Sequence, residues 1–172
     1  MSNYQSLMTS IGLLSDTHSF LDPKIFEYFK DVDEIRHAGD IGSIEVTDKL
    51  KKFKPLRAVY GNIDDHILRS EFPEFNRFTI EKVDVLMTHI GGKPGKYSKP
   101  AFEELEVQAP KLFICGHSHI LLVKMDPKYN MLWMNPGACG IKGFHQVKTL
   151  LRFQINEDKI QNLEAIEIGK RV

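Results

Sequence analysis

The sequence predicts an α/β fold in which two packed β-sheets are flanked by helices. Two observations support this class. In the first half of the chain, short apolar runs alternate with segments of helical period, whereas the second half consists mostly of strand-like runs separated by turns. No linker, low-complexity run or internal repeat divides the halves, so we expect them to share one core.

The first half alternates between strand and helix. Ile11–Leu14 is an apolar run typical of a buried strand. Pro23 falls in the first turn of the helix that follows, where a missing N–H costs little. Pro55 marks the end of a second helix, and the third strand stops at Gly61. The predicted elements are strands at 11–14, 34–38 and 56–60 and helices at 23–30 and 44–53.

The second half is expected to be rich in strands. Residues 77–80 and 83–88 are typical of two strands joined by a turn around Lys82, and residues 101–105 form at most a short helix. Turns at 126–127 and 156–158 separate later strands. These later strands are predicted at 111–115, 121–125, 131–135, 150–155 and 160–168.

Length and composition narrow the class of protein. The chain has 172 residues, within the range of one domain. We therefore expect a single domain over residues 1–172, with residues 1–10 forming a flexible or extended N-terminal segment. Lys plus Arg and Asp plus Glu are equal at 23 each, so no basic excess indicates a nucleic acid or membrane partner.

The two cysteines, Cys115 and Cys139, are too few for a disulfide framework and are spaced unlike a zinc ribbon. A reducing compartment fits this usage better than secretion does. No secretory signal precedes the first strand, and no window approaches the ~20 apolar residues of a membrane helix. We expect a cytoplasmic protein.

Side chains that can bind metal ions follow five of the predicted strands. A single histidine after a strand is more often structural, but here such residues recur at successive strand ends beside glycines, which let a metal approach the backbone. Asp40 lies at a turn where both carboxylate oxygens can be used, so it can bridge two metals. Oxygen and imidazole donors without thiolate suit a catalytic site for Mn²⁺, Fe²⁺, Zn²⁺ or Co²⁺. The candidate ligands are Asp16, His18, Asp40, Asn62, His89, His117 and His119.

In their order along the chain, these motifs resemble the signature of the calcineurin-like metallophosphoesterases. The matching segments are Asp16-x-His18, Gly39-Asp40, Gly61-Asn62-x-Asp64, His89 and Gly116-His117-x-His119. The resemblance spans about residues 11–140. The short length and the turn at 135–137 are similar to the small bacterial and archaeal phosphodiesterase branch. That branch has a eukaryotic relative, the retromer subunit Vps29, which acts as a scaffold.

The resemblance implies a four-layer α/β/β/α sandwich of two mixed sheets flanked by helices, and two divalent metal ions. Mn²⁺ is expected first, with Fe, Zn, Ni or Co as alternatives. A metal-bridging hydroxide would attack a small phosphoester in line, with Asp40, Asn62 and Asp64 as the catalytic residues. Asp16, His18, Asp40 and His119 would hold one ion, and Asp40, Asn62, His89 and His117 the other, with Asp40 as the bridge.

Two positions depart from the family pattern. Many relatives have a histidine directly after the motif asparagine, where it can protonate the leaving group, but this chain has Ile63. A phosphodiesterase is therefore favoured over a phosphomonoesterase. His66 is either a substitute acid or, more often in such a place, a solvated loop histidine. The family motif His-Gly-His is replaced by His89-Ile90-Gly91, so a histidine is missing at position 91.

The segment 91–97 is the best candidate for a flexible loop that contacts substrate, because it is basic, aromatic and close to His89. We predict Lys93 and Lys96, with Asn62, as substrate-binding residues; the alternative is an ordinary solvated connection. Lys142, His145 and Lys148 are expected to face solvent.

Two functions of different classes remain open. The first is a metal-dependent phosphoesterase whose partner is a small phosphoester. The second is an interaction module similar to the scaffold relative, which keeps the fold and a weak metal site; complete retention of the ligand residues argues against it. A nuclease acting on long nucleic acid would need a basic groove, which the net charge does not indicate. The sequence leaves homo-oligomer formation open.

Overall fold

The computed structural model describes residues 8–172, and one five-stranded sheet carries both ends of this region. The strands of this first sheet lie in the order β12-β11-β1-β2-β3. Strands β1, β2 and β3 are parallel to one another. Strand β11 pairs antiparallel with both β1 and β12. Their bounds are β1 Met8–Leu14, β2 Glu34–His37, β3 Leu56–Ala58, β11 Val147–Asn156 and β12 Lys159–Lys170.

The second sheet has the same mixed character. Its strands lie in the order β4-β5-β8-β10-β9, with β5, β8 and β10 parallel and an antiparallel strand at each edge. Their bounds are β4 Phe75–Ile80, β5 Val83–Thr88, β8 Leu112–Ile114, β9 Leu121–Asp126 and β10 Met131–Pro136. Each sheet thus contributes three neighbouring parallel strands.

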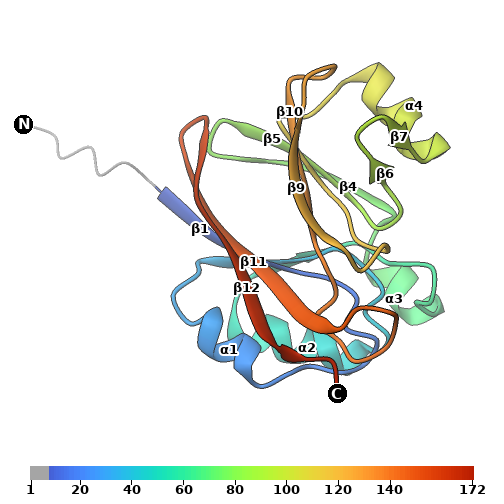
Figure 1. Ribbon diagram of the computed structural model, residues 1–172, viewed down its shortest axis with the longest axis vertical. Coiled ribbons are helices and arrows are strands. Elements are labelled where there is room, and N and C mark those ends of the chain that lie inside the picture. The colour runs from blue at the N-terminus through green and yellow to red at the C-terminus, as the bar shows by residue number, and fades with distance from the viewer. Residues whose placement is uncertain (1–7) are drawn as a thin grey trace, which may run out of the picture.

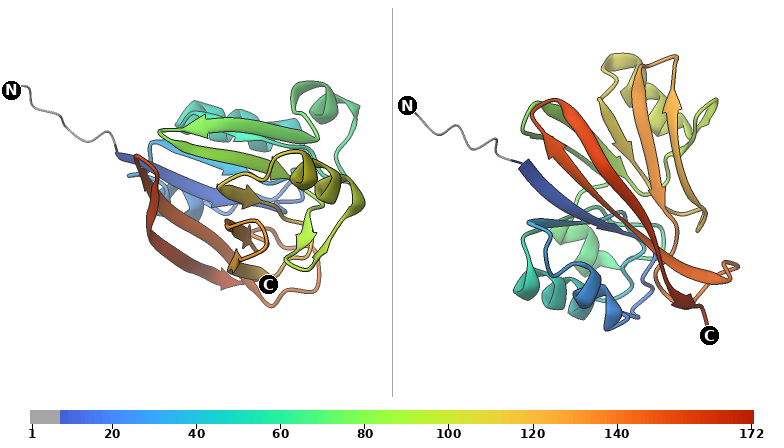
Figure 2. Two further views of the ribbon diagram at one scale, coloured as in Figure 1. Left: turned by 90° about the horizontal axis from the view of Figure 1, so that it is seen from above. Right: turned by 60° about the vertical axis from the view of Figure 1, so that its left-hand side comes forward.

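Helices cover the outer faces. In Figures 1 and 2, α1 and α2 lie at one end of the molecule and α4 at the other, with the sheets between them. Within residues 8–172, no helix has the length and apolar content needed to cross a membrane. The helices are α1 Lys24–Tyr28, α2 Ile44–Phe53, α3 His66–Glu71 and α4 Lys99–Val107, and β6 Gly92–Lys93 pairs with β7 Lys96–Tyr97 in a small hairpin.

Three buried apolar clusters correspond to the three interfaces of a four-layer sandwich. The first cluster joins the sheets and includes Leu13 from β1 and Met87 from β5. The second packs the first sheet against α1 to α3, through residues such as Leu50. The third packs the second sheet against α4, with Leu105 facing Trp133. The predicted two-sheet α/β/β/α sandwich is therefore confirmed.

The differences from the predicted elements lie in short segments. Helix α3 was not predicted, although Asp65 at its N-cap accepts hydrogen bonds from the amides of Ile67 and Leu68. The segment 91–97, expected to be a flexible loop, forms the β6–β7 hairpin instead. Met8 to Ser10 belong to β1, and the rest of the expected N-terminal segment lies outside the described residues.

Leu13→Ala tests the core between the sheets. Leu13 is fully buried in this cluster, so we expect the free energy of unfolding to fall by about 2–5 kcal/mol. Leu163→Ala is the control, because Leu163 is 41% exposed and should change stability by less than about 1 kcal/mol. Urea unfolding monitored by circular dichroism measures both. Equal losses for the two variants would contradict the assigned core.

Candidate metal centre

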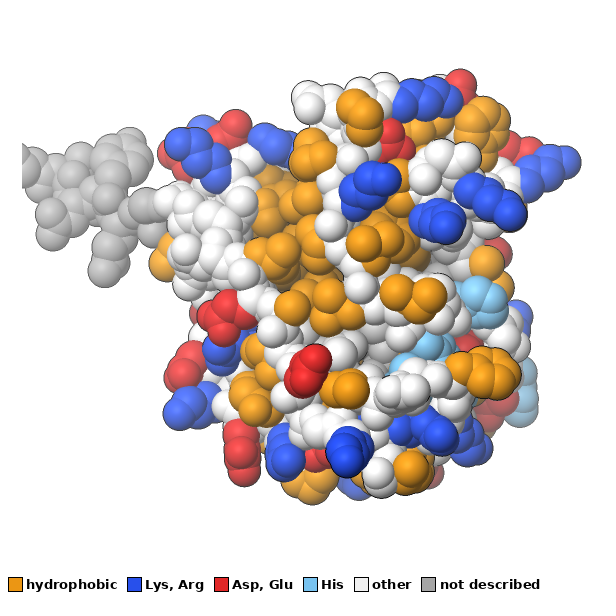
Figure 3. All heavy atoms as spheres, viewed as in Figure 1, with side chains coloured by type: hydrophobic (Ala, Val, Ile, Leu, Met, Phe, Trp, Pro, Cys, Tyr) orange, Lys and Arg blue, Asp and Glu red, His pale blue; other side chains and the backbone are white. Residues whose placement is uncertain are grey.

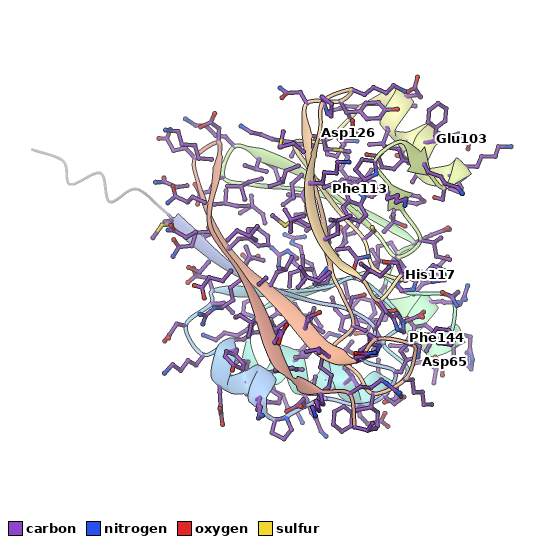
Figure 4. All side chains as sticks on the ribbon, in the orientation of Figure 1. Asp65, Glu103, Phe113, His117, Asp126 and Phe144 are labelled. Carbon is purple, nitrogen blue, oxygen red and sulfur yellow. The ribbon has the colours of Figure 1, made fainter. Side chains whose placement is uncertain are left out.

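The predicted ligand residues follow parallel strands of both sheets. Asp16 and His18 come after β1, Asp40 after β2 and Asn62 after β3. In the second sheet, His89 follows β5, and the loop after β8 holds His117 and His119. Because the carboxyl ends of parallel strands lie at one edge of a sheet, the loops can meet there. Figure 4 labels His117 at this edge, where the two sheets approach each other.

Six of the side chains form two groups that can each hold a metal ion. Within each group, one ligand atom per residue lies within 4.8 Å of the others. Both groups combine a carboxylate with two imidazoles, a donor set that suits Zn²⁺, Mn²⁺ or Fe²⁺. The first group is Asp16, His18 and His119, and the second is Asp40, His89 and His117.

Asp16 is fully buried, and its two oxygens have different surroundings. Its Oδ2 accepts hydrogen bonds from the Ser15 hydroxyl at 2.6 Å and the His117 amide at 3.2 Å. Its Oδ1 has no hydrogen-bond partner within residues 8–172 and lies 3.1 Å from Nε2 of His119. One oxygen is therefore anchored, and the other is left facing the histidines.

Asp40 lies between the groups. Its Oδ1 is 3.2 Å from Nε2 of His89, whereas its Oδ2 is 3.6 Å from Nε2 of His18. Burial alone would raise the pKa of Asp40, but the neighbouring imidazole of His89 and the hydrogen bond from the amide of Ile63 outweigh it and lower that pKa. The carboxylate is therefore ionised, with one oxygen toward each group.

The fit of a cation can be tested on the polar atoms that the fold leaves unsatisfied. Buried polar atoms in proteins normally have hydrogen-bond partners. Among the described residues, Oδ1 of Asp16 and Nε2 of His18 and His89 are buried without one. No lysine or arginine in this part of the chain forms an ion pair with Asp16 or Asp40. Buried carboxylates and imidazole nitrogens that converge in this way fit divalent metal ions.

The hydrogen bonds of His89 favour a metal-binding tautomer. Its Nδ1 lies 2.7 Å from the carbonyl oxygen of Ala38, which only a protonated Nδ1 can satisfy. Burial lowers the pKa of His89, but the carboxylates of Asp40 and Asp16 raise it by a larger amount, so the net shift is upward. Burial lowers the pKa of His18 despite the same two carboxylates, which favours the neutral imidazole.

His119 is oriented by a second histidine. Nε2 of His145 lies 2.8 Å from the carbonyl oxygen of Gly140, so this nitrogen carries the proton and Nδ1 is an acceptor. His119 then donates from its own Nδ1, 3.2 Å away, and presents an unprotonated Nε2 to Asp16. His145 was expected to face solvent, but it is half-buried and both of its ring nitrogens have hydrogen-bond partners. A partner 26 residues along the chain could not be found from sequence spacing.

The loops that hold the ligands have a strained backbone. Asp16, His18, Asp40, His117 and His119 all have φ between 46° and 69°, in the left-handed region that residues other than glycine rarely adopt. Hydrogen bonds between loops hold this conformation: the amides of Asp16 and His18 donate to the carbonyl oxygens of Gly39 and Asp40. Such strain is typical of functional sites.

Two glycines let the loops approach the carboxylates closely. A Cβ atom on Gly61 would lie 2.0 Å from Oδ1 of Asp40, and one on Gly116 would lie 2.1 Å from the Ser15 hydroxyl and 2.9 Å from Oδ2 of Asp16. No other residue fits either position without displacing a carboxylate or its partner.

The catalytic role predicted for Asp64 stays a prediction, and the structure shows this side chain in hydrogen bonds between loops. Its buried carboxylate accepts hydrogen bonds from three backbone amides, those of Ile41, Gly42 and Gly61, at 2.7–3.1 Å. It therefore ties the loop after β2 to the loop that carries Asn62. Asn62 itself is exposed next to Ile63, whose amide donates to Asp40.

Sequence reasoning missed the contribution of His37. This fully buried residue lies at the end of β2, where its Nδ1 accepts from the amide of Gly39 and its Nε2 bonds the Thr17 hydroxyl. Burial lowers the pKa of His37 to about 3, so it is neutral. His37 thus links the loop after β1, through Thr17, to the loop after β2, through Gly39.

The basic residues considered as candidates lie in three different environments. Lys93 and Lys96 are exposed on the β6–β7 hairpin, and both line a groove beside His117. His66 is exposed at the start of α3 and belongs to neither ligand group. Lys148 was expected to face solvent but is buried in an ion pair with Asp22 at 2.6 Å. In Figure 3, histidines reach the surface on the right, with lysines and hydrophobic side chains above them.

Comparison with known proteins agrees with this geometry. Residues 9–158 match the model of the calcineurin-like phosphoesterase superfamily domain. The chain belongs to this superfamily. A probable metallophosphoesterase of Methanothermobacter thermautotrophicus is 34% identical over 134 residues, which cover 74% of this chain and 76% of the relative. A second, from Methanocaldococcus jannaschii, is 30% identical over 157 residues, covering 88% and 78%. The chain is thus a phosphoesterase-superfamily member with candidate ligands for divalent metals.

Solved structures share the fold at lower identity. An archaeal phosphodiesterase superposes with a TM-score of 0.75 at 22% identity, over 93% of this chain and 100% of that one. Vps29 from Entamoeba histolytica, solved in complex with Zn²⁺, gives a TM-score of 0.70 at 16% identity, over 94% and 99%. At these sequence identities, the structural similarity shows that the fold is shared and does not assign a function.

Asp64→Asn tests the tie between the loops. An asparagine keeps one acceptor oxygen but turns an NH₂ group toward backbone amides, so we expect unfolding to become easier by about 1–3 kcal/mol. Asp65→Asn is a matched control, because asparagine and aspartate are equivalent N-caps. Urea unfolding compares the two. A smaller loss of unfolding free energy for Asp64→Asn than for Asp65→Asn would refute the structural role assigned to Asp64.

Proposed function

We propose that the protein is a dinuclear metal-dependent phosphodiesterase that hydrolyses a small phosphoester. The observation that carries this proposal is the pair of adjacent ligand groups, with one oxygen of Asp40 toward each. Membership of the phosphoesterase superfamily supports the reaction class. The choice of a diester, the number of metals and their identity are our inference, as are a single domain and a cytoplasmic location.

The ligands are assigned by extending the two groups. Asp40 would bridge, because its Oδ2 faces His18 and its Oδ1 faces His89. Asn62 would complete the second group with its amide oxygen, since its loop is held against Asp40 through the amide of Ile63. Asp16, His18, Asp40 and His119 would hold one ion, and Asp40, Asn62, His89 and His117 the other. Oxygen and imidazole donors favour Mn²⁺ in our proposal, with Fe, Zn, Ni and Co as alternatives.

Two bound divalent cations would supply a water of lowered pKa and neutralise charge that develops on the phosphoryl oxygens. The protein's own groups would provide orientation. His89 presents Nε2 because Ala38 holds its other nitrogen, and His119 presents Nε2 because His145 does the same. Exposed Asn62 can donate its amide N–H to a phosphoryl oxygen, and Lys93 and Lys96 can attract the anionic substrate.

Ile63 supports a diester over an alkyl monoester. Its side chain is 46% exposed beside Asn62 and can neither donate nor accept a proton. Many superfamily members are expected to have a histidine there, which can protonate a leaving alkoxide and contribute ~10²–10⁴ in rate. His66 is exposed outside both ligand groups, so we do not assign it this task. Esters with good leaving groups, including phosphodiesters, depend least on such an acid.

The second candidate is an interaction module without turnover. The likeness to Vps29 concerns the fold, but apolar side chains are exposed close to His117, including Ile120 at 64%. A surface of this kind can bind a protein. The complete set of ligand residues favours the enzyme, because binding a partner does not require the carboxylates of Asp16 and Asp40 to be buried among histidines.

The function is tested by hydrolysis of bis(p-nitrophenyl) phosphate and p-nitrophenyl phosphate with chelator-treated protein, before and after adding Mn²⁺. We expect Mn²⁺ to restore cleavage and the diester to be preferred. Asp40→Ala should lower the rate at least about 100-fold and reduce metal content in both groups, whereas His66→Ala should change little.

Each other outcome has a definite meaning. Full rate and metal content in Asp40→Ala would refute the bridge. Preference for the monoester would refute the diester assignment. Bound metal without cleavage of either ester would favour the interaction module.

His145→Phe tests the orientation of His119. Phenylalanine keeps a ring of similar size but removes the acceptor at Nδ1, so His119 is no longer held in the tautomer that presents Nε2. We expect the affinity for one of two Mn²⁺ ions to fall about 10–100-fold in calorimetric titration. His66→Phe is the control with an exposed histidine. Unchanged affinity for both ions would show that His145 does not position His119.

A further inference from the structure

A groove of about 570 Å³ adjoins the candidate metal centre. It lies between the β6–β7 hairpin and the start of β9, and three residues of the ligand-bearing loop after β8 form part of its wall. His117 is one of these, so the groove is continuous with the second ligand group. Its volume suits a small organic group. The lining residues that matter here are Ile90, Tyr97, His117, Ile120, Leu122 and Trp133.

The groove walls are apolar although they face solvent. Ile90 is 44% exposed, Ile120 64% and Leu122 37%. Aromatic rings come from Tyr97 and from Trp133, which is almost fully buried behind the groove. Three large apolar side chains gathered beside a polar centre indicate a surface that gains free energy when a ligand covers it.

Charge limits what the ligand can be. Lys93 and Lys96 line the same groove, and neither forms an ion pair with a carboxylate within residues 8–172. A ligand that suits the whole site therefore has an anionic part near the ligand groups and the lysines, and an apolar part beyond them. An apolar ester of phosphate has both parts.

We infer that the groove binds the aromatic, non-leaving ester group of a phosphodiester whose phosphate lies at the metal ligands. This inference rests on the proposed function and names its substrate class. Tyr97 offers a ring contact, backed by the buried ring of Trp133, and Ile90 and Ile120 offer apolar walls, which suit a planar ring of aryl or nucleobase size. Ile120 is then a specificity-determining residue, because it is the most exposed of the apolar wall residues.

The test compares two diesters with the same p-nitrophenolate leaving group: p-nitrophenyl phenyl phosphate and methyl p-nitrophenyl phosphate. We expect the Mn²⁺-loaded protein to prefer the phenyl ester in kcat/KM. Ile120→Asn should lower the ratio of phenyl to methyl ester about fivefold to tenfold. Leu163→Asn, which changes an exposed leucine outside the groove, should leave the ratio unchanged. Comparing variants removes any difference in intrinsic reactivity between the esters.

A binding measurement separates this inference from the proposed function. Trp133 is the single tryptophan of the chain and lines the groove, so its fluorescence reports occupancy. Diphenyl phosphate should change the emission saturably, dimethyl phosphate should not, and Ile120→Asn should weaken the diphenyl phosphate titration about fivefold or more.

The outcomes are distinguishable. If the methyl ester is cleaved but Ile120→Asn changes neither the ratio nor the titration, the groove assignment is wrong and the phosphodiesterase stands. If neither ester is cleaved but diphenyl phosphate still binds in the groove, the proposed activity fails and the groove assignment stands. Dibutyl phosphate binding as tightly as diphenyl phosphate would overturn the aromatic specificity.

Discussion

The site depends on two buried carboxylates, Asp16 and Asp40, which have no lysine or arginine partner among residues 8–172. Ionised side chains are costly to bury unless hydrogen bonds and opposite charges compensate. The fold supplies the hydrogen bonds, from Ser15 and the amides of His117 and Ile63, but within residues 8–172 it leaves the opposite charge to histidines that converge on the same point. A divalent cation in each group would complete this balance.

The parallel strands explain how such a constraint can be met. In each sheet three neighbouring parallel strands end at one edge, and buried apolar side chains hold these strands in place. The loops beyond them can then adopt left-handed conformations at Asp16 and Asp40, because hydrogen bonds from loop to loop and the close approach at Gly61 restrict the backbone there. Core packing far from the site thus stabilises the strained backbone that aims the ligands.

Sequence patterns predicted those parts of the structure that depend on neighbours along the chain. Strand ends followed by Asp, Asn or His located the ligand loops, and the two groups bring six of these side chains together. The patterns failed where a partner is distant: His145 contacts His119 across 26 residues, and Lys148 reaches Asp22 across 126. Helix α3 was missed for another reason. It has only six residues, too few for a helical period, and its one local signal was the N-cap Asp65.

The metal ligands and the groove come from different kinds of segment, which separates chemistry from selectivity. The ligands follow buried parallel strands, whereas half of the groove residues lie on the β6–β7 hairpin and at the exposed start of β9. A change at Ile120 can therefore alter which ester group fits without disturbing Asp16 or Asp40. The two parts meet in the loop after β8, where His117 belongs to both. A bound ester group would contact the loop that positions His117. A substrate that fills the groove would therefore also restrain this metal-binding side chain. Selectivity would then extend to rate as well as binding.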